Sequence, residues 1–429
     1  MEYIMGFSHS GKPVKDLSRI KRLLHAVGDP QERLRFVHIA GTNGKGSMAQ
    51  MFSEGFICSG LKTGLFTSPY ILEYSDRIRV NGENISQGEL EELAAVVKKA
   101  IESLGGDKGF SQFEITQAIA FLHFERQSCD VVVLETGLGG LLDCTNVVNT
   151  SVLTVIGSVD YDHTAILGDT LEEIAAQKAG IIKPQVPCVL SAGNDMRVVD
   201  VVSRTAAEKG AQLVIPDLSL MKLGESGIFG TRFEYRGREY STAMGGYHQV
   251  LNAMSVIEGF WLIKDGFELD DDSAAMGISR AVIHGRAEVV SHSPLTVLDG
   301  AHNPDGMGAL AKVIESSGKL PCRAVIGMCR DKSIAEAVSK LIPFVERFVT
   351  VDGFSERAES AEVLAEIISN AGGKAYPAVG SIAGEIRKMQ NENPDGLCLI
   401  CGSLFLVSDV LHSWGQDNSQ DRTEFDGGK

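Results

Sequence analysis

A lysine between two glycines, in the run Gly41-Thr42-Asn43-Gly44-Lys45-Gly46-Ser47, carries the clearest chemistry in the chain. It follows the apolar run Phe36–Ala40 and precedes a helix-like segment, so a strand is expected to turn into a helix N-terminus. There, backbone N–H groups and the positive end of the helix dipole attract an anion. Lys45 adds a charge and Ser47 a hydroxyl, so the run predicts a nucleotide phosphate site. A purely structural turn would explain the glycines but not the lysine.

Candidate metal-binding side chains follow two other apolar runs. Glu135 ends the run Val131–Leu134, and His163 comes after Val152–Ile156. In open α/β sheets, ligands bind beyond the carboxyl ends of the strands, so both side chains are expected to reach one cleft. Mg²⁺ prefers carboxylate oxygens and completes its shell with water and phosphate. A solvated loop glutamate and a structural histidine are the alternatives to a shared Mg²⁺ site.

A buried lysine is predicted at Lys178. The segment Thr170–Glu173 has a capping-box pattern, which places a helix start there. Along that helix, Lys178 lies on the apolar stripe with Leu171, Ile174 and Ile181. Desolvation lowers the pKa of a lysine and raises the fraction of neutral amine, which can react with CO₂. A lysine that snorkels to the surface is the alternative.

The second half of the chain supplies residues suited to a nucleotide. Asn252 carries a donor and an acceptor in one amide, which suits an adenine edge. Arg286 lies in a Gly-Arg linker, where its guanidinium could clamp a phosphate. Asp299 leaves the apolar run Leu295–Leu298, and His302 follows closely.

The composition excludes several classes of protein. A chain of 429 residues with 44% hydrophobic and 22% charged residues is expected to form a soluble protein of two or three domains. The formal charge of −16 argues against a nucleic-acid partner. No segment resembles a signal peptide or a membrane span, so a cytoplasmic location without membrane contact is expected. The eight cysteines are read as reduced; Cys398 and Cys401 lie three apart on a predicted strand and would face opposite sides.

The pattern of apolar and helical segments predicts an α/β fold in two domains that positions the candidate site residues. Apolar runs alternate with helical patterns, which predicts a large N-terminal domain with a mostly parallel sheet over residues 1–285. A second cycle predicts a smaller, Rossmann-like α/β domain over 286–415, followed by a flexible tail over 416–429. Residues 213–243 are expected to form a small antiparallel insertion with a turn at Gly237.

The phosphate loop resembles that of folylpolyglutamate synthases and dihydrofolate synthases, members of the Mur ligase superfamily. Its spelling AGTNGKGS separates the lysine from the serine by a glycine, as in that family. Further segments resemble family motifs in the same order: Thr67–Tyr70, Glu135–Asn146, Asp162–Thr170, Ile174–Ile181, Gly246–Ala253, Asp299–Pro304 and Gly402–Val407.

The resemblance implies roles for the candidate residues. Metal ligands would be Ser68, Glu135, His163 and Lys178 as a carbamate, with two Mg²⁺ sites and K⁺ as a further candidate cation. ATP would contact Thr42, Asn43, Gly44, Lys45, Gly46, Ser47, Asn252, Arg286 and Asp299. Lys45, Lys178 and His302 would be catalytic, and Phe113, Glu114, Thr116 and Asp143 would line the folate site. Leu141 stands where the family has an arginine, which removes a cation near the pterin.

The resemblance implies an ATP-dependent ligase that acts through an acyl phosphate in a cleft between two domains. Its small-molecule partners would be L-glutamate, ATP and tetrahydrofolate (poly)glutamates, with dihydropteroate as a further candidate acceptor; a monomer is expected. Another Mur-type amide ligase, acting on a nucleotide-linked or other carboxylate substrate, is one alternative. A non-catalytic nucleotide switch is the other, but it leaves Asp299–Pro304 and His248–Asn252 unexplained.

Overall fold

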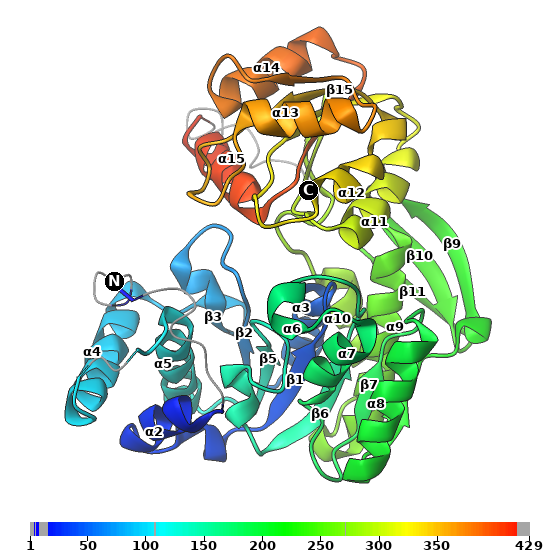
Figure 1. The fold of residues 1–429 in the computed structure, drawn as a ribbon. Coiled ribbons are helices and arrows are strands. Elements are labelled where there is room, and N and C mark those ends of the chain that lie inside the picture. Colours follow the sequence, from blue (N-terminus) through cyan, green and yellow to red (C-terminus); the bar gives the residue numbers. More distant parts are fainter. Residues whose placement is uncertain (1–3, 5, 8–15, 107–108, 271, 418–429) are drawn as a thin grey trace, which may run out of the picture. The chain divides into compact units, whose positions relative to one another are not determined.

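The computed structural model describes residues 4, 6–7, 16–106, 109–270 and 272–417, which form two compact units (Figure 1). The larger unit spans Met1–Leu223, Phe233–Thr242 and His248–Val282, and the smaller one spans Gly224–Arg232, Ala243–Tyr247 and Ile283–Lys429. The larger unit thus ends at Val282, a few residues before the predicted boundary. The sequence did not predict that Gly224–Arg232, inside the insertion, and Ala243–Tyr247, directly after its strands, belong to the smaller unit.

The larger unit is built on an eight-stranded sheet of order β4-β3-β2-β5-β1-β6-β7-β8. Its strands are β1 (Phe36–Ala40), β2 (Thr63–Phe66), β3 (Ile78–Val80), β4 (Glu83–Asn84), β5 (Val131–Glu135), β6 (Ser151–Ile156), β7 (Cys188–Leu190) and β8 (Leu213–Val214). In this order the pairs from β2 through β5, β1, β6 and β7 to β8 are parallel, whereas β2–β3 and β3–β4 are antiparallel. The predicted mostly parallel α/β fold is therefore confirmed.

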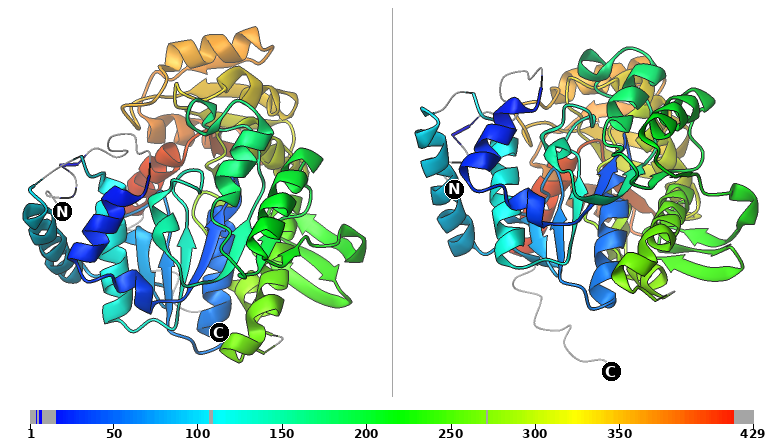
Figure 2. Two further views of the ribbon diagram at one scale, coloured as in Figure 1. Left: turned by 60° about the horizontal axis from the view of Figure 1, so that its bottom comes forward. Right: turned by 90° about the horizontal axis from the view of Figure 1, so that it is seen from below.

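Helices cover both faces of this sheet, as Figure 2 shows. The helices of the larger unit are α2 (Ser18–Ala26), α3 (Lys45–Cys58), α4 (Gln87–Ser103), α5 (Gln112–Arg126), α6 (Thr164–Leu167), α7 (Leu171–Ala179), α8 (Met196–Lys209), α9 (Tyr247–Phe267) and α10 (Ser273–Arg280). On one face α9 packs against α3 so closely that a Cβ on Gly259 would stand 2.5 Å from the Phe52 ring. Short 3₁₀ helices of this unit are η1 (Pro30–Arg33), η2 (Tyr74–Arg77), η3 (Cys144–Val147) and η4 (Leu218–Leu220), and η5 (Ile342–Phe344) lies in the smaller unit.

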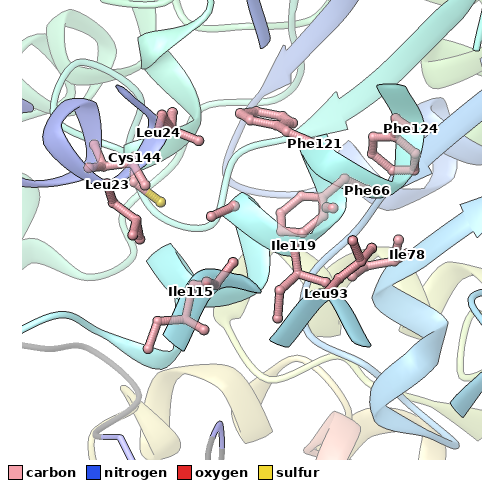
Figure 3. Close-up of a cluster of buried hydrophobic side chains, with 14 of the residues drawn as sticks. Leu23, Leu24, Phe66, Ile78, Leu93, Ile115, Ile119, Phe121, Phe124 and Cys144 are labelled. Atoms are coloured by element: carbon pink, nitrogen blue, oxygen red, sulfur yellow. The ribbon is translucent and has the colours of Figure 1, made fainter. Parts of the chain in front are cut away.

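The opposite face carries a large apolar core between the sheet and helices α2, α4 and α5 (Figure 3). Phe66 on β2 and Phe121 and Phe124 on α5 are fully buried there. A serine N-cap starts each of α4 and α5: Ser86 accepts from the Glu89 N–H, and Ser111 forms a capping box. This core fixes β2 and β5, whose carboxyl ends carry candidate site residues.

The insertion and the smaller unit follow. Strands β9 (Met221–Gly227), β10 (Gly230–Tyr235) and β11 (Arg238–Thr242) form a three-stranded sheet, and Gly237 has φ +77° in the predicted turn.

The smaller unit's sheet has the order β12-β13-β17-β14-β15-β16, and all its pairs are parallel except for that of β12 with β13. Its strands are β12 (Glu288–His292), β13 (Leu295–Asp299), β14 (Cys322–Ile326), β15 (Val345–Thr350), β16 (Ala375–Pro377) and β17 (Leu397–Cys401).

Helices α11 (Pro304–Glu315), α12 (Ile334–Ser339) and α13 (Ala361–Asn370) share one apolar core with this sheet. On the other face lie α14 (Ile382–Glu392) and α15 (Leu404–Asp417), with Met389 against Cys398. The C-x-x-C pair lies in buried strand β17, as predicted. Residues 418–429, most of the predicted tail, lie outside the described residues, and residues 416–417 belong to α15.

Candidate active site

The glycine-rich run forms the turn from β1 into α3, as the sequence predicts. Gly44 is the N-cap of α3 and has φ +82°, a left-handed backbone that favours glycine. The Nζ of Lys45 donates to the carbonyl oxygens of Gly41 at 3.1 Å and Thr42 at 3.2 Å. The turn therefore combines the first N–H groups of a helix with a cation, an arrangement that binds phosphate.

Asn252 on α9 contacts the same loop. A Cβ on Gly44 would stand 2.4 Å from the Oδ1 of Asn252. The Asn252 amide donates to Gln249 Oε1 at 3.0 Å, and the Gln249 amide donates to Ser47 Oγ at 3.2 Å. All three side chains are buried. The structure thus brings predicted residues Ser47 and Asn252 together through Gln249, whose part the sequence did not reveal.

The phosphate loop is also joined to the segment that follows β6. Thr42 Oγ1 donates to the carbonyl oxygen of Asp160 at 3.1 Å and accepts from the Asp160 N–H at 3.0 Å. His163 follows as the N-cap of α6, with φ +52° and a side chain that is 39% exposed. Its Nε2 lies 3.8 Å from an oxygen of Asp162. The histidine segment therefore lies beside the phosphate loop.

Glu135 is the last residue of β5, and it is buried. The backbone N–H of Ser68, just beyond the neighbouring strand β2, donates to Glu135 Oε2 at 3.2 Å. Adjacent strand ends thus bring two of the predicted metal ligands together. Across the described residues, no three His, Cys, Asp or Glu side chains form a group that could hold a metal ion. A cation at Glu135 would therefore take further oxygens from hydroxyl, phosphate or water.

Lys178 is buried in α7, and the predicted capping box at Thr170 and Glu173 starts that helix. Desolvation is the main cause that lowers the pKa of Lys178 to about 7. The positive charge of Lys45 lowers this pKa further, and Asp162 opposes the change. Lys178 therefore lies within electrostatic reach of both the phosphate loop and the histidine segment.

Two of the predicted folate residues have hydrogen bonds inside the larger unit. Glu114 accepts from Arg19 Nε at 2.9 Å and, in the capping box of α5, from the Ser111 N–H at 2.9 Å. Thr116 is fully buried, and its hydroxyl contacts the hydroxyl of Tyr74. These contacts hold α5 against α2 and the segment after β2.

The other two predicted folate residues lie against the turn after Glu135. Asp143 Oδ2 accepts from the Leu138 N–H at 2.7 Å, and Oδ1 accepts from the Thr145 N–H at 3.0 Å and its hydroxyl at 2.5 Å. Burial raises the pKa of Asp143, and these hydrogen bonds oppose the shift. A Cβ on Gly137 would stand 2.6 Å from the Phe113 ring, so Phe113 packs on the same turn.

The smaller unit gathers its predicted residues at the end of β13. Asp299 is buried, and its carboxylate accepts from the N–H groups of Ala287 and Ala301, each at 2.7 Å. Burial raises the pKa of Asp299, whereas the charge of Arg286 lowers it. His302 Nδ1 lies 2.9 Å from the carbonyl oxygen two residues before it.

Besides Gln249, two further buried polar residues of the larger unit were not predicted from the sequence. His38 on β1 is fully buried, with Nε2 2.9 Å from Thr145 Oγ1, and burial lowers its pKa to about 3. Arg77 at the end of η2 is 6% exposed. The signals that could have found them were a histidine inside an otherwise apolar central strand and an arginine just before β3.

No helix within the described part of the chain has both the length and the apolar composition that a membrane crossing needs.

Comparisons with known proteins agree with this geometry. A family model described as "Mur ligase, glutamate ligase domain" matches residues 285–404. The dihydrofolate synthase/folylpolyglutamate synthase of Bacillus subtilis is 35% identical over 410 residues, covering 92% of this chain and 94% of the relative. A Mycobacterium tuberculosis folylpolyglutamate synthase with ADP and AMPPCP has a TM-score of 0.84 at 26% identity, covering 93% of this chain and 95% of that one. The apo form of the Lacticaseibacillus casei folylpolyglutamate synthase has a TM-score of 0.83 at 30% identity, covering 96% of this chain and 98% of that one. The chain belongs to the folylpolyglutamate synthase/dihydrofolate synthase family of Mur ligases, ATP-dependent enzymes that join glutamate to folates.

Proposed function

We propose that the main activity of this protein is the addition of glutamate to reduced folates that already carry glutamate. A dihydrofolate synthase must hold an acceptor without any glutamate, so it depends more on contacts to the pterin and benzoate. Leu141, at the position of the family arginine, is 45% exposed beside the Asp143 turn and offers no charge to that part of the substrate. This exposed leucine is the observation that carries the proposal. The alternative is a bifunctional enzyme, and the Bacillus subtilis relative supports it, because its name gives both dihydrofolate synthase and folylpolyglutamate synthase.

The reaction must activate a carboxylate, because a carboxylate is a poor electrophile at neutral pH. Transfer of the ATP γ-phosphoryl group gives an acyl phosphate, which the glutamate amine attacks with loss of phosphate. Lys45 and the N–H groups of the loop would stabilise the charge on the transferring group. The M. tuberculosis relative with ADP and AMPPCP supports ATP as the donor.

Ser68, Glu135 and His163 would hold Mg²⁺. A buried carboxylate next to a residue with a hydroxyl, at the ends of adjacent strands, supplies the hard oxygen donors that fit this ion. When bound, Mg²⁺ would neutralise phosphate charge. Lys178, as a carbamate, would add a carboxylate-like ligand for a second ion, which its burial and its pKa of about 7 favour.

The remaining residues would position the substrates. Asn252 suits the adenine edge, as its contact with the loop supports. In the smaller unit, Arg286 would bind phosphate, Asp299 the nucleotide, and His302 would lie close to the phosphates. Phe113 and Asp143 would line the folate site at the turn after Glu135, together with Glu114 and Thr116 of α5.

Glutamate-dependent ADP release tests the proposal directly. The purified protein would be given tetrahydrofolate monoglutamate, tetrahydrofolate diglutamate, dihydropteroate and a UDP-linked peptide in parallel. We expect turnover with both tetrahydrofolates and little with dihydropteroate. Robust glutamate addition to dihydropteroate would show a bifunctional enzyme, and activity only with the UDP-linked peptide would indicate another Mur-type ligase.

A further inference from the structure

Arg77 is a buried cation whose guanidinium makes no hydrogen bond within the described residues. It is 6% exposed, and its Nε is buried without a partner. It also forms no ion pair with any described carboxylate. Burying an ion costs several kcal/mol unless hydrogen bonds and opposite charge compensate it. A guanidinium in this state is therefore uncommon and points to a partner from outside the chain.

Two tyrosine rings cover the guanidinium. Its centre lies 5.2 Å from the Tyr70 ring and 5.4 Å from the Tyr74 ring. Each cation–π contact is worth roughly 0.5–2 kcal/mol, which offsets only part of the cost of burial. The two ring centres are only 5.8 Å apart, so both rings lie on one side of the guanidinium. A ring face is a weak hydrogen-bond acceptor, so the aromatic contacts hold the guanidinium while its N–H donors remain for another group.

The backbone places Arg77 beside the candidate metal ligands. The Thr67 N–H donates to the carbonyl oxygen of Arg77 at 3.1 Å, and the next residue, Ser68, donates to Glu135 at 3.2 Å. The negative charge of Glu135 acts on Arg77, although the two make no ion pair. An anion on Arg77 would therefore lie near the carboxyl ends of β2 and β5.

We propose that Arg77 binds an oxyanion of a substrate: the carboxylate of the folate that accepts the phosphoryl group, or a phosphate of ATP. This assignment rests on the proposed function. A planar guanidinium can donate two parallel hydrogen bonds to either group. Because the chain carries a formal charge of −16, an anionic substrate needs a fixed local cation such as this one.

The test compares Arg77→Gln and Arg77→Lys with the wild-type protein. Calorimetry would give the Kd for AMPPCP and for tetrahydrofolate monoglutamate, each at saturating Mg²⁺. We expect Arg77→Gln to weaken one of the two by at least about tenfold, with Arg77→Lys in between, since lysine keeps the charge but loses the paired donors. The ligand that weakens identifies the source of the oxyanion. Arg126→Gln is the matched control, because that arginine is 41% exposed and pairs with Glu92 at 3.0 Å; both Kd values should stay unchanged.

The rival role for Arg77 is that of a counter-ion to Glu135 only. In that case both Kd values of a folded Arg77→Gln protein stay within about twofold of wild type, while the Mg²⁺ concentration for half-maximal binding shifts. That result would overturn the proposal. If Arg77→Gln does not give a cooperative melting curve, unchanged Kd values in Arg77→Lys overturn it instead. Failure of the proposed function is separate, because it appears as absent glutamate addition by the wild-type protein, whereas AMPPCP binding stays measurable.

Discussion

The side-chain oxygen of Asn252 lies against the backbone of Gly44, 2.4 Å from the place where a Cβ would stand. Gly44→Ala therefore meets two costs: a contact too short for any real Cβ and a φ of +82° that alanine rarely adopts. We expect the KM for ATP to rise at least about tenfold, because either the loop or the Asn252 side chain must move to accept the methyl group.

Gly60→Ala is the matched control. Gly60 has a similar φ of +80°, but nothing lies within 4 Å of the position that the new methyl group would take. This variant should lose about 1 kcal/mol of stability and keep its KM for ATP. An equal rise of KM in both variants would mean that the Asn252 contact has no part in the effect.

Lys45→Ala should abolish turnover with little change in the melting temperature. The Lys45 side chain donates to two loop carbonyls and lies outside the apolar core, so its removal leaves that core intact. The measurement is steady-state ADP release alongside a thermal melt. Wild-type kinetics in a folded Lys45→Ala protein would remove Lys45 from the phosphate site.

Much of this arrangement could be predicted because its signals are local. The glycine run, the capping box before Lys178 and the apolar runs before Glu135 and Asp299 each occupy a few consecutive residues, and the structure places each as expected. A helical stripe also predicted the burial of Lys178, since periodicity alone decides which face is apolar.

What could not be predicted depends on contacts between distant segments. Gln249 links Ser47 to Asn252 only because α9 packs on α3, and no local pattern records that packing. From the sequence alone, Arg77 resembles an ordinary surface arginine, and only the structure shows that it is buried against the rings of Tyr70 and Tyr74. Strands β4 and β16 are too short, at two and three residues, to give a periodic signal.

Glu135→Ala and His163→Ala should each raise the Mg²⁺ concentration needed for half-maximal rate. Each change removes a side chain that is proposed to bind the metal ion. Hydrogen bonds between Thr42 and Asp160 join the phosphate loop to the segment that carries His163. Glu125→Ala is the control, since that carboxylate forms an ion pair with Arg33, which precedes β1 and so lies away from the carboxyl ends of the strands. Unchanged Mg²⁺ dependence in both site variants would place the ion elsewhere.

Leu141→Arg should increase activity with dihydropteroate relative to tetrahydrofolate diglutamate. The side chain is 45% exposed, so an arginine fits there without burial of its charge and restores the cation of the family motif. Leu142→Arg, at a neighbouring position that is 38% exposed, controls for added charge alone. Equal changes in the two variants would argue against a specific role for position 141.

The carbamylation of Lys178 should depend on pH through its lowered pKa. With a pKa of about 7, half of the amine is neutral at pH 7, and roughly a tenth is neutral one unit lower. Only the neutral amine attacks CO₂, so reactivation of CO₂-depleted protein by bicarbonate should slow steeply as the pH falls below 7. A lysine with an ordinary pKa would stay almost fully charged throughout this range.

The chemical state of Lys178 can be read directly with ¹³C-labelled bicarbonate, because a carbamate gives its own NMR signal. Lys178→Ala should lose that signal and the activity, and short carboxylates should restore part of the rate by supplying the missing oxygens. Lys183→Ala is the control: the pKa of Lys183 is also lowered, to about 8, but its Nζ already donates to the main-chain and side-chain oxygens of Asn146, at 3.0 and 2.9 Å. A fully active protein at saturating bicarbonate that shows no carbamate signal would leave Lys178 as a plain buried amine, and the second metal ligand would have to come from another residue.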